Sequence, residues 1–100
     1  MTRNGLRSMT TKRRARERQL ANSRRVVLLR SGGQCEGRVA DTCTGVGIHA
    51  HHRRMRSQGG SNEPENLAWL CLPCHAHVHA NPEQSYELGL LLHSWDGGAA

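Results

Sequence analysis

The sequence predicts a small α+β domain in which a basic N-terminal helix precedes a strand, a loop, a second strand and a short helix. A chain of 100 residues with three aromatic side chains and no Phe is one domain with little apolar mass for a core. Six of its seven histidines and two of its four cysteines lie between positions 49 and 79. Packing of so small a core does not require this density, so a metal-dependent site is the first hypothesis.

Positive charge is concentrated in the first 30 residues. They contain ten Arg or Lys residues against one acid, whereas the rest of the chain has four Arg against seven acids. A basic segment of this kind attracts the phosphate backbone of nucleic acid. An acidic membrane surface would attract it too, but no apolar face accompanies the charge. An ordinary solvated tail is the alternative to a DNA-binding arm that uses Lys12, Arg13, Arg14 and Arg16.

The same segment predicts the N-terminal helix. From about Thr11 to Arg30 the composition favours helix, and a Gly-Gly pair ends it. Only the turns from about Asn22 onward are apolar enough to pack on a domain. We expect a basic arm over residues 1–21, flexible or partly helical, a folded domain over 22–96 and a frayed tail over 97–100.

Two adjacent histidines lie in the first expected strand, residues 48–53. Side chains that follow one another in a strand point to opposite faces, so His51 and His52 suit different tasks. One can bind a metal ion while the other faces a substrate. His49 lies two residues before His51, and we expect it near the site or at the surface rather than among the ligands.

The second strand and the last helix follow a Gly-Gly turn. Residues 66–70 form a short apolar strand, and a helix over 74–80 lies between two prolines. On this helix His75 and His79 share a face, so they can reach one ion together. His77 lies on another face and cannot join them.

The four cysteines form a second candidate site. No segment is apolar enough for a signal peptide or a membrane span, so we expect a cytoplasmic protein with reduced thiols. Cys35 and Cys43, together with the Cys-x-x-Cys of Cys71 and Cys74, would hold one structural zinc ion in a closed tetrahedral site. The first spacing is wider than usual, so the assignment depends on the second pair. Free thiols or a disulfide are the alternatives.

Together these residues resemble the motif of the HNH nucleases, whose fold is called ββα-metal or His-Me finger. The likeness extends over about residues 28–79 and includes the Cys-x-x-Cys that many members carry. The segments RSQGGSNEPENL and HANPEQSYELGLLLHSW resemble the small, basic, single-domain HNH proteins of bacteriophages. The motif residues that match are His51, His52, Asn66, His75 and His79.

The resemblance implies a role for each of these residues in phosphodiester hydrolysis. His52 matches the general base that activates water, a task that suits histidine because its reference pKa is about 6.5. His51 and His75 match ligands of the catalytic metal. His79 matches a histidine that binds the metal in some members and phosphate in others. Asn66 matches an Asn whose amide bonds across the loop and holds the general base in orientation.

The resemblance leaves the catalytic ion open. Imidazole ligands favour Mn, Ni, Co or Zn over Mg, whereas members of the family commonly use Mg or Mn. A four-cysteine zinc site is also common among HNH proteins. Arg53, Arg54 and Arg56 follow the paired histidines and could bind phosphates beside the cleaved bond, or simply form a solvated loop.

These observations favour a divalent-metal-dependent DNA endonuclease that nicks or cuts both strands with little sequence preference. The likeness to bacteriophage proteins implies a protein of the host-cell cytoplasm that acts beside terminase in DNA packaging, or a free-standing endonuclease. We expect no membrane partner and no small-molecule substrate. The alternative is a non-catalytic, zinc-stabilised module that binds nucleic acid, although such a module would need no general base.

Overall fold

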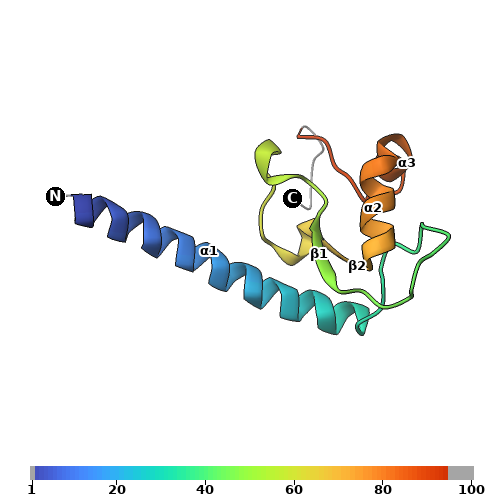
Figure 1. The fold of residues 1–100 in the computed structure, drawn as a ribbon, viewed down its shortest axis with the longest axis horizontal. Coiled ribbons are helices and arrows are strands. Elements are labelled where there is room, and N and C mark those ends of the chain that lie inside the picture. The colour runs from blue at the N-terminus through green and yellow to red at the C-terminus, as the bar shows by residue number, and fades with distance from the viewer. Residues whose placement is uncertain (1, 95–100) are drawn as a thin grey trace.

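The computed structural model describes residues 2–94, with side chains from residue 10 onward, so the predicted tail over 97–100 lies outside the described residues. It confirms the predicted class, a small α+β fold with a two-stranded sheet (Figure 1). None of its described helices is long and apolar enough to cross a membrane. The elements, in order, are α1 (Thr2–Ser31), β1 (His49–His52), the 3-10 turns η1 (Arg56–Gln58) and η2 (Pro64–Asn66), β2 (Leu67–Leu70), α2 (Leu72–Ala80) and α3 (Pro82–Glu87).

The helix α1 is longer than the composition predicted. We expected it to begin near Thr11, but the backbone is helical from Thr2, and no proline interrupts the segment. At its C-terminal end Gly32 has a φ of 64°, and the N–H of Gly33 donates to the carbonyl of Leu28 at 3.2 Å. This left-handed glycine cap ends the helix as predicted. In Figure 1 the N-terminal part of α1 projects beyond the sheet.

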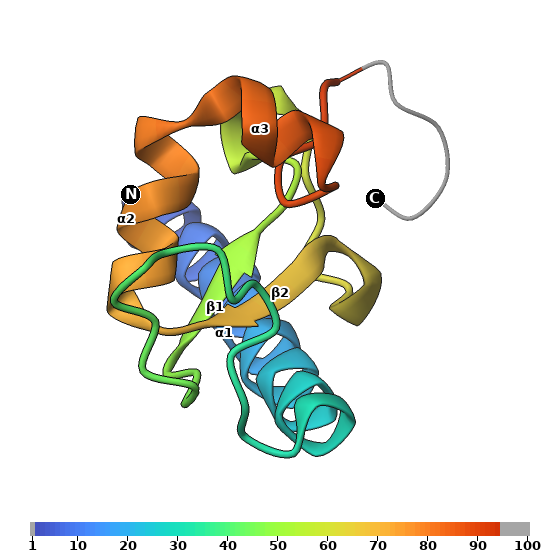
Figure 2. The same cartoon turned by 90° about the vertical axis from the view of Figure 1, so that its right-hand side faces the viewer.

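The sheet lies between α1 and α2. The strands β1 and β2 are antiparallel, with Ala50 opposite Trp69 and His51 opposite Ala68. Alternation of side chains sends Ala50 and Leu67 to one face, where they pack against Val27 of α1. The turned view in Figure 2 shows α1 and α2 on either side of the sheet.

The opposite face of the sheet carries the main core. Ala68 and Leu70 of β2 pack there against Val78 of α2 and against Leu90 and Leu91, which follow α3. Three buried cysteines belong to the same cluster. The apolar core is small, as the composition predicted, and the cysteines occupy a large part of it.

The loop between α1 and β1 carries the first cysteine pair toward α2. A single bridge between Gln34 and Val46 closes this loop, and the N–H of Cys35 donates to the Gly45 carbonyl at 3.0 Å. The helix α2 then begins at Leu72, with Cys71 as its N-cap and a proline in its first turn. The second pair of cysteines therefore lies at the start of the helix that also carries His75 and His79.

Candidate active site

Three histidines from two elements converge on one point. His51 of β1 and His75 and His79 of α2 each offer a ring nitrogen, and these atoms all lie within 4.8 Å of one another. The Nε2 atoms of His75 and His79 are 3.1 Å apart. Two imidazole nitrogens that each lie about 2.1 Å from a shared ion are separated by about 3.0–3.4 Å. The donor set therefore fits a transition-metal ion.

His51 is fixed and neutral. It is 2% exposed, and its Nε2 donates to the backbone carbonyl of Leu90 at 2.7 Å. Because a carbonyl only accepts, Nδ1 is left with the lone pair that a metal ion needs. Burial lowers the pKa of His51 to about 4, and the positive charge of a protonated His75 or His79 acts in the same direction. The ring is thus ready to bind a cation at neutral pH.

The helix spacing on α2 behaves as predicted. His75 and His79, four residues apart, face the same point, and burial together with His49 and His79 lowers the pKa of His75. His77 lies apart and bonds Gln84 at 2.8 Å. The His49 ring is tilted against that of His75 with centroids 4.4 Å apart, yet His49 is not one of the three converging residues.

Strand alternation places His52 on the opposite face of β1 from His51, and the hydrogen-bond partner of His52 lies across the loop. Its Nε2 is 2.8 Å from Oδ1 of Asn62, a part-buried contact between residues ten apart. An amide oxygen only accepts, so Nε2 carries the ring proton and Nδ1 has the free lone pair. His51 and His52 therefore differ in partner and surroundings, as strand alternation predicted. Both still line one pocket of about 270 Å³, with His75, His79 and Arg56.

Asn66 braces the loop that carries Asn62. It is fully buried, its Oδ1 accepts from the backbone N–H of Arg54 at 2.7 Å, and its Nδ2 donates to the carbonyls of Arg54 and Ser61. Gly60 closes the same loop, where a Cβ atom would overlap the Arg54 carbonyl oxygen. Asn66 thus holds the backbone at Arg54, two residues after His52, and at Ser61, the neighbour of Asn62. The predicted support of His52 by Asn66 is therefore indirect.

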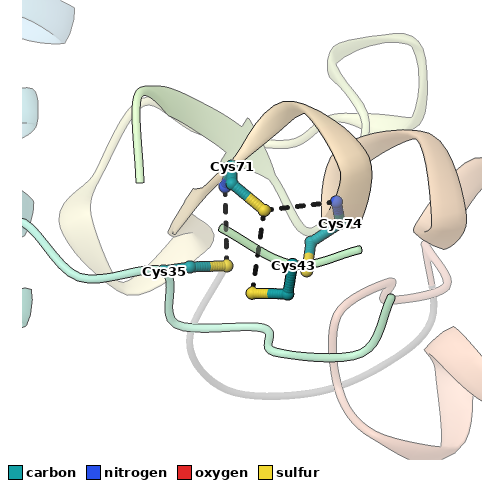
Figure 3. Close-up of side chains that lie close together, drawn as sticks. All are labelled: Cys35, Cys43, Cys71 and Cys74. Carbon is teal, nitrogen blue, oxygen red and sulfur yellow. Dashed lines mark hydrogen bonds between the residues drawn. The ribbon is translucent and has the colours of Figure 1, made fainter. Parts of the chain in front are cut away.

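The four cysteines converge on a second point, shown in Figure 3. The Sγ atoms of Cys43 and Cys71 are 3.8 Å apart. Four sulfurs that each lie about 2.3 Å from a tetrahedral zinc ion are separated by about 3.8 Å. The N–H of Cys71 donates to Cys35 Sγ, and the N–H of Cys74 donates to Cys71 Sγ, both at 3.4 Å. The donor set, its spacing and these N–H groups fit a closed zinc site.

The thiols of this cluster differ in acidity. Burial opposes ionisation of Cys71, but backbone N–H groups of Cys74 and Thr44 outweigh it and lower the pKa to about 6. Burial raises the pKa of Cys74 to about 12. Four thiolates this close repel one another, so a cation is needed before all four can ionise.

The arginines predicted to bind DNA have different surroundings. The Arg53 side chain donates to the carbonyls of Gly89 and Glu65, and Arg54 is 9% exposed with its Nε donating to the His93 carbonyl. Arg56 is exposed and lines the histidine pocket. Lys12, Arg13, Arg14 and Arg16 are all exposed on α1.

Residues 33–81 match the family model described as HNH endonuclease. This segment belongs to the HNH endonuclease family. The matched HNH segment contains both strands, α2, the three converging histidines, His52, Asn66 and all four cysteines. The helix α1 lies outside it. No curated protein and no solved structure matched the chain.

Two groups of the HNH site were not predicted from the sequence. Asn62 lies in an irregular loop ten residues after His52, where no periodic pattern relates the two. The Leu90 carbonyl that orients His51 is a backbone atom 39 residues away, so no side-chain type marks it. A polar residue beside a tight Gly-Gly turn was the one available signal for Asn62.

Proposed function

We propose that the protein is a divalent-metal-dependent DNA endonuclease that hydrolyses phosphodiester bonds at the histidine pocket. One observation carries the proposal: three converging histidines and a separately held fourth, His52, line the same pocket. Arg56 lies at its edge, where a cation can contact a phosphate. A binding module would need neither the converging ligands nor the oriented fourth histidine.

The three converging histidines are proposed to hold the catalytic ion, His51 through Nδ1 and His75 and His79 through Nε2. When bound, a divalent ion there neutralises charge that develops on the phosphate and on the leaving oxygen. The burial of His51 and its bond to the Leu90 carbonyl keep the ring neutral and in one orientation. Nitrogen ligands favour Mn, Ni or Zn over Mg at this position.

His52 is proposed to act as the general base. The Asn62 amide oxygen accepts from Nε2, which leaves Nδ1 to accept a proton from the attacking water. Asn66 fixes the backbone at Arg54 and at Ser61, and so holds the two ends of the His52–Asn62 contact. The cysteine cluster is proposed to bind structural zinc, which stabilises the start of α2 and with it the position of His75.

The likeness to small bacteriophage HNH proteins supports a place beside a terminase in DNA packaging. Cleavage that rises when a phage terminase large subunit is added would support this role. Cleavage that is unchanged by terminase would indicate a free-standing endonuclease.

The proposal is tested by incubating supercoiled plasmid with purified full-length protein and Mg, Mn, Ni or Zn, for wild type and His52→Ala. We expect metal-dependent conversion to nicked or linear DNA by wild type and loss of at least a hundredfold in rate for His52→Ala, the size of a general-base contribution. DNA binding and the thermal midpoint should be close to wild type. Full zinc content and DNA binding without cleavage in any ion would instead indicate the non-catalytic module.

A further inference from the structure

A second hollow lies beside the histidine pocket, on the α1 side of the sheet. It has a volume of about 530 Å³ and is lined by Arg13, Arg16, Glu17, Leu20, Arg56, Gly60 and Asn62. We call it the α1 groove. One wall comes from α1, outside the segment that matches the HNH family, and the other from the loop that holds His52.

The α1 groove joins the histidine pocket through two residues. Arg56 lines both hollows, and Asn62 lines the groove while its Oδ1 accepts from Nε2 of His52. A chain of phosphates that passes the three converging histidines can therefore continue past Arg56 into the groove. The two hollows are therefore neighbours, and Arg56 lies between the proposed scissile bond and α1.

The charge of the groove fits a phosphodiester backbone. Among the side chains that the structure describes, no hydrogen bond or ion pair engages the guanidinium of Arg16 or Arg56, and both residues are exposed. Arg13 contacts Glu17 at 3.6 Å, and both of these side chains are largely exposed. Three arginines thus face the hollow against one carboxylate.

The helix that forms one wall of the groove is fixed to the domain. Gln19 donates to Glu63 at 3.1 Å, and Arg30 donates to the carbonyls of Pro64 and Leu67. Val27 is fully buried against the sheet. Gln19 precedes Val27 in α1 and Arg30 follows it. These contacts therefore fix the helix to the domain on both sides of its buried residue.

We infer that the α1 groove binds the backbone of the DNA strand next to the scissile phosphate, with Arg13 and Arg16 on one wall and Arg56 at the entrance. The inference rests on the proposed endonuclease function and adds the direction in which the strand leaves the site. It also separates the cations of α1 into two sets. Arg13 and Arg16 share a helix face with Leu20, whereas Arg18 and Arg25, seven residues apart, share a face on the far side of the helix.

The test compares two double variants that change the charge equally. Full-length protein in a His52→Ala background binds a short labelled DNA duplex, without added catalytic metal, and anisotropy is followed across salt concentrations. We expect Arg13→Gln/Arg16→Gln to lower affinity on the order of 10–100-fold near 0.1 M salt, and to flatten the log–log salt slope by about 2. Arg18→Gln/Arg25→Gln should lower affinity less than about threefold, because only long-range attraction is lost.

A third variant should change affinity in the opposite direction, which no loss of folding can mimic. Glu17→Gln removes the one carboxylate of the groove and releases Arg13, so affinity should rise about threefold or more. Glu87→Gln, an equal charge change at the end of α3, should have a smaller effect. Equal losses in both double variants, or equal effects of the two Glu variants, would overturn the inference.

Cleavage by the same variants with His52 intact separates this inference from the proposed function. Plasmid cleavage by wild type, combined with equal DNA affinity of the two double variants, would support the endonuclease function and contradict DNA binding in the α1 groove. Absence of cleavage, combined with the expected difference in DNA affinity between the double variants, would contradict the endonuclease function and support the α1 groove as a DNA-binding site.

Discussion

The two clusters are built on one helix and differ in what surrounds them. In the cysteine cluster three of four side chains are buried, sulfurs accept backbone N–H bonds, and the residues belong to the apolar core. In the histidine cluster only His51 is buried, His79 is exposed, and the residues line an open pocket. A closed site with four ligands suits a structural ion, whereas three ligands beside a pocket leave room for a substrate.

The helix α2 connects the two clusters. Its N-terminal turn holds Cys71 and Cys74, and the residue after Cys74 is His75. Any shift of the cysteines therefore moves the first histidine directly. We therefore expect the closed cluster to position His75 and His79 in the open one, and the variants below test that dependence.

The largest effect is expected from Cys71→Ser. Loss of one thiolate should release zinc and unfold the domain, since structural zinc contributes about 10–16 kcal/mol of apparent binding free energy and small domains have about 5–15 kcal/mol of stability. His75→Ala, on the same helix, should retain one zinc ion and a similar thermal midpoint while it loses cleavage. Zinc content by mass spectrometry, circular dichroism and plasmid cleavage measure the three properties. A Cys71→Ser protein that melts like wild type would show that the closed cluster is not the structural support.

A smaller effect is expected within the open site from Asn62→Ala. Loss of the amide oxygen frees the His52 ring to rotate and to change tautomer, so kcat should fall about 10–100-fold, the usual size for a group that orients a functional histidine. Asn62→Asp retains an acceptor for Nε2 and should recover much of kcat, while its added carboxylate in the α1 groove should raise KM.

KM and the thermal midpoint distinguish this role from a structural one. Both should stay close to wild type in Asn62→Ala, because the proposed contact acts on the orientation of the base. An Asn62→Ala protein with normal kcat, or an Asp variant no better than Ala, would contradict the assignment.

The grouping of the side chains in each cluster could be predicted because it follows a local rule. Four-residue spacing placed His75 and His79 together, and strand alternation separated His51 from His52. The grouping of all four cysteines followed from the Cys-x-x-Cys pair and the reducing compartment expected for the chain. Ion binding at both clusters, and the identity of each ion, remain predictions.

The supporting contacts could not be predicted because they depend on how distant segments fold together. The Leu90 carbonyl meets His51 only after α3 returns the chain to the core, and Asn62 meets His52 only after Asn66 and Gly60 shape an irregular loop. Likewise, the count of cations in α1 did not indicate which of them face the loop. Assigning each cation of α1 to one face requires the direction in which the helix crosses the sheet, and tertiary packing determines that direction.

The smallest effect is expected where α1 joins the cysteine loop. Glu36 follows Cys35, and both of its carboxylate oxygens accept hydrogen bonds from the Arg30 guanidinium, at 2.6 and 2.9 Å. One of these oxygens also accepts from the backbone N–H of Trp69 at 2.9 Å. Burial opposes ionisation of Glu36, but the Arg30 guanidinium and the Trp69 N–H outweigh it and hold the pKa below its usual range. The charged carboxylate is therefore stabilised in the folded state. Because this pair is partly exposed, its contribution is about 0.5–1 kcal/mol.

A carboxyl group whose pKa is lowered by folding stabilises the protein above its unfolded pKa, about 4.3 for Glu, and that stabilisation is lost as the pH falls through the folded value. At pH 7 the free energy of unfolding of Glu36→Gln should thus be about 0.5–1 kcal/mol lower than that of wild type. This difference, the stability gap, should narrow as the pH falls below about 4.3. Denaturant titrations at pH 7, 5 and 4 measure the gap, and comparison of the two proteins at each pH cancels the acid sensitivity of the thiolates that they share. A Glu36→Gln gap that stayed constant through pH 4 would mean that the side chain acts through packing, and that the charge of the pair does not fix α1 to the domain.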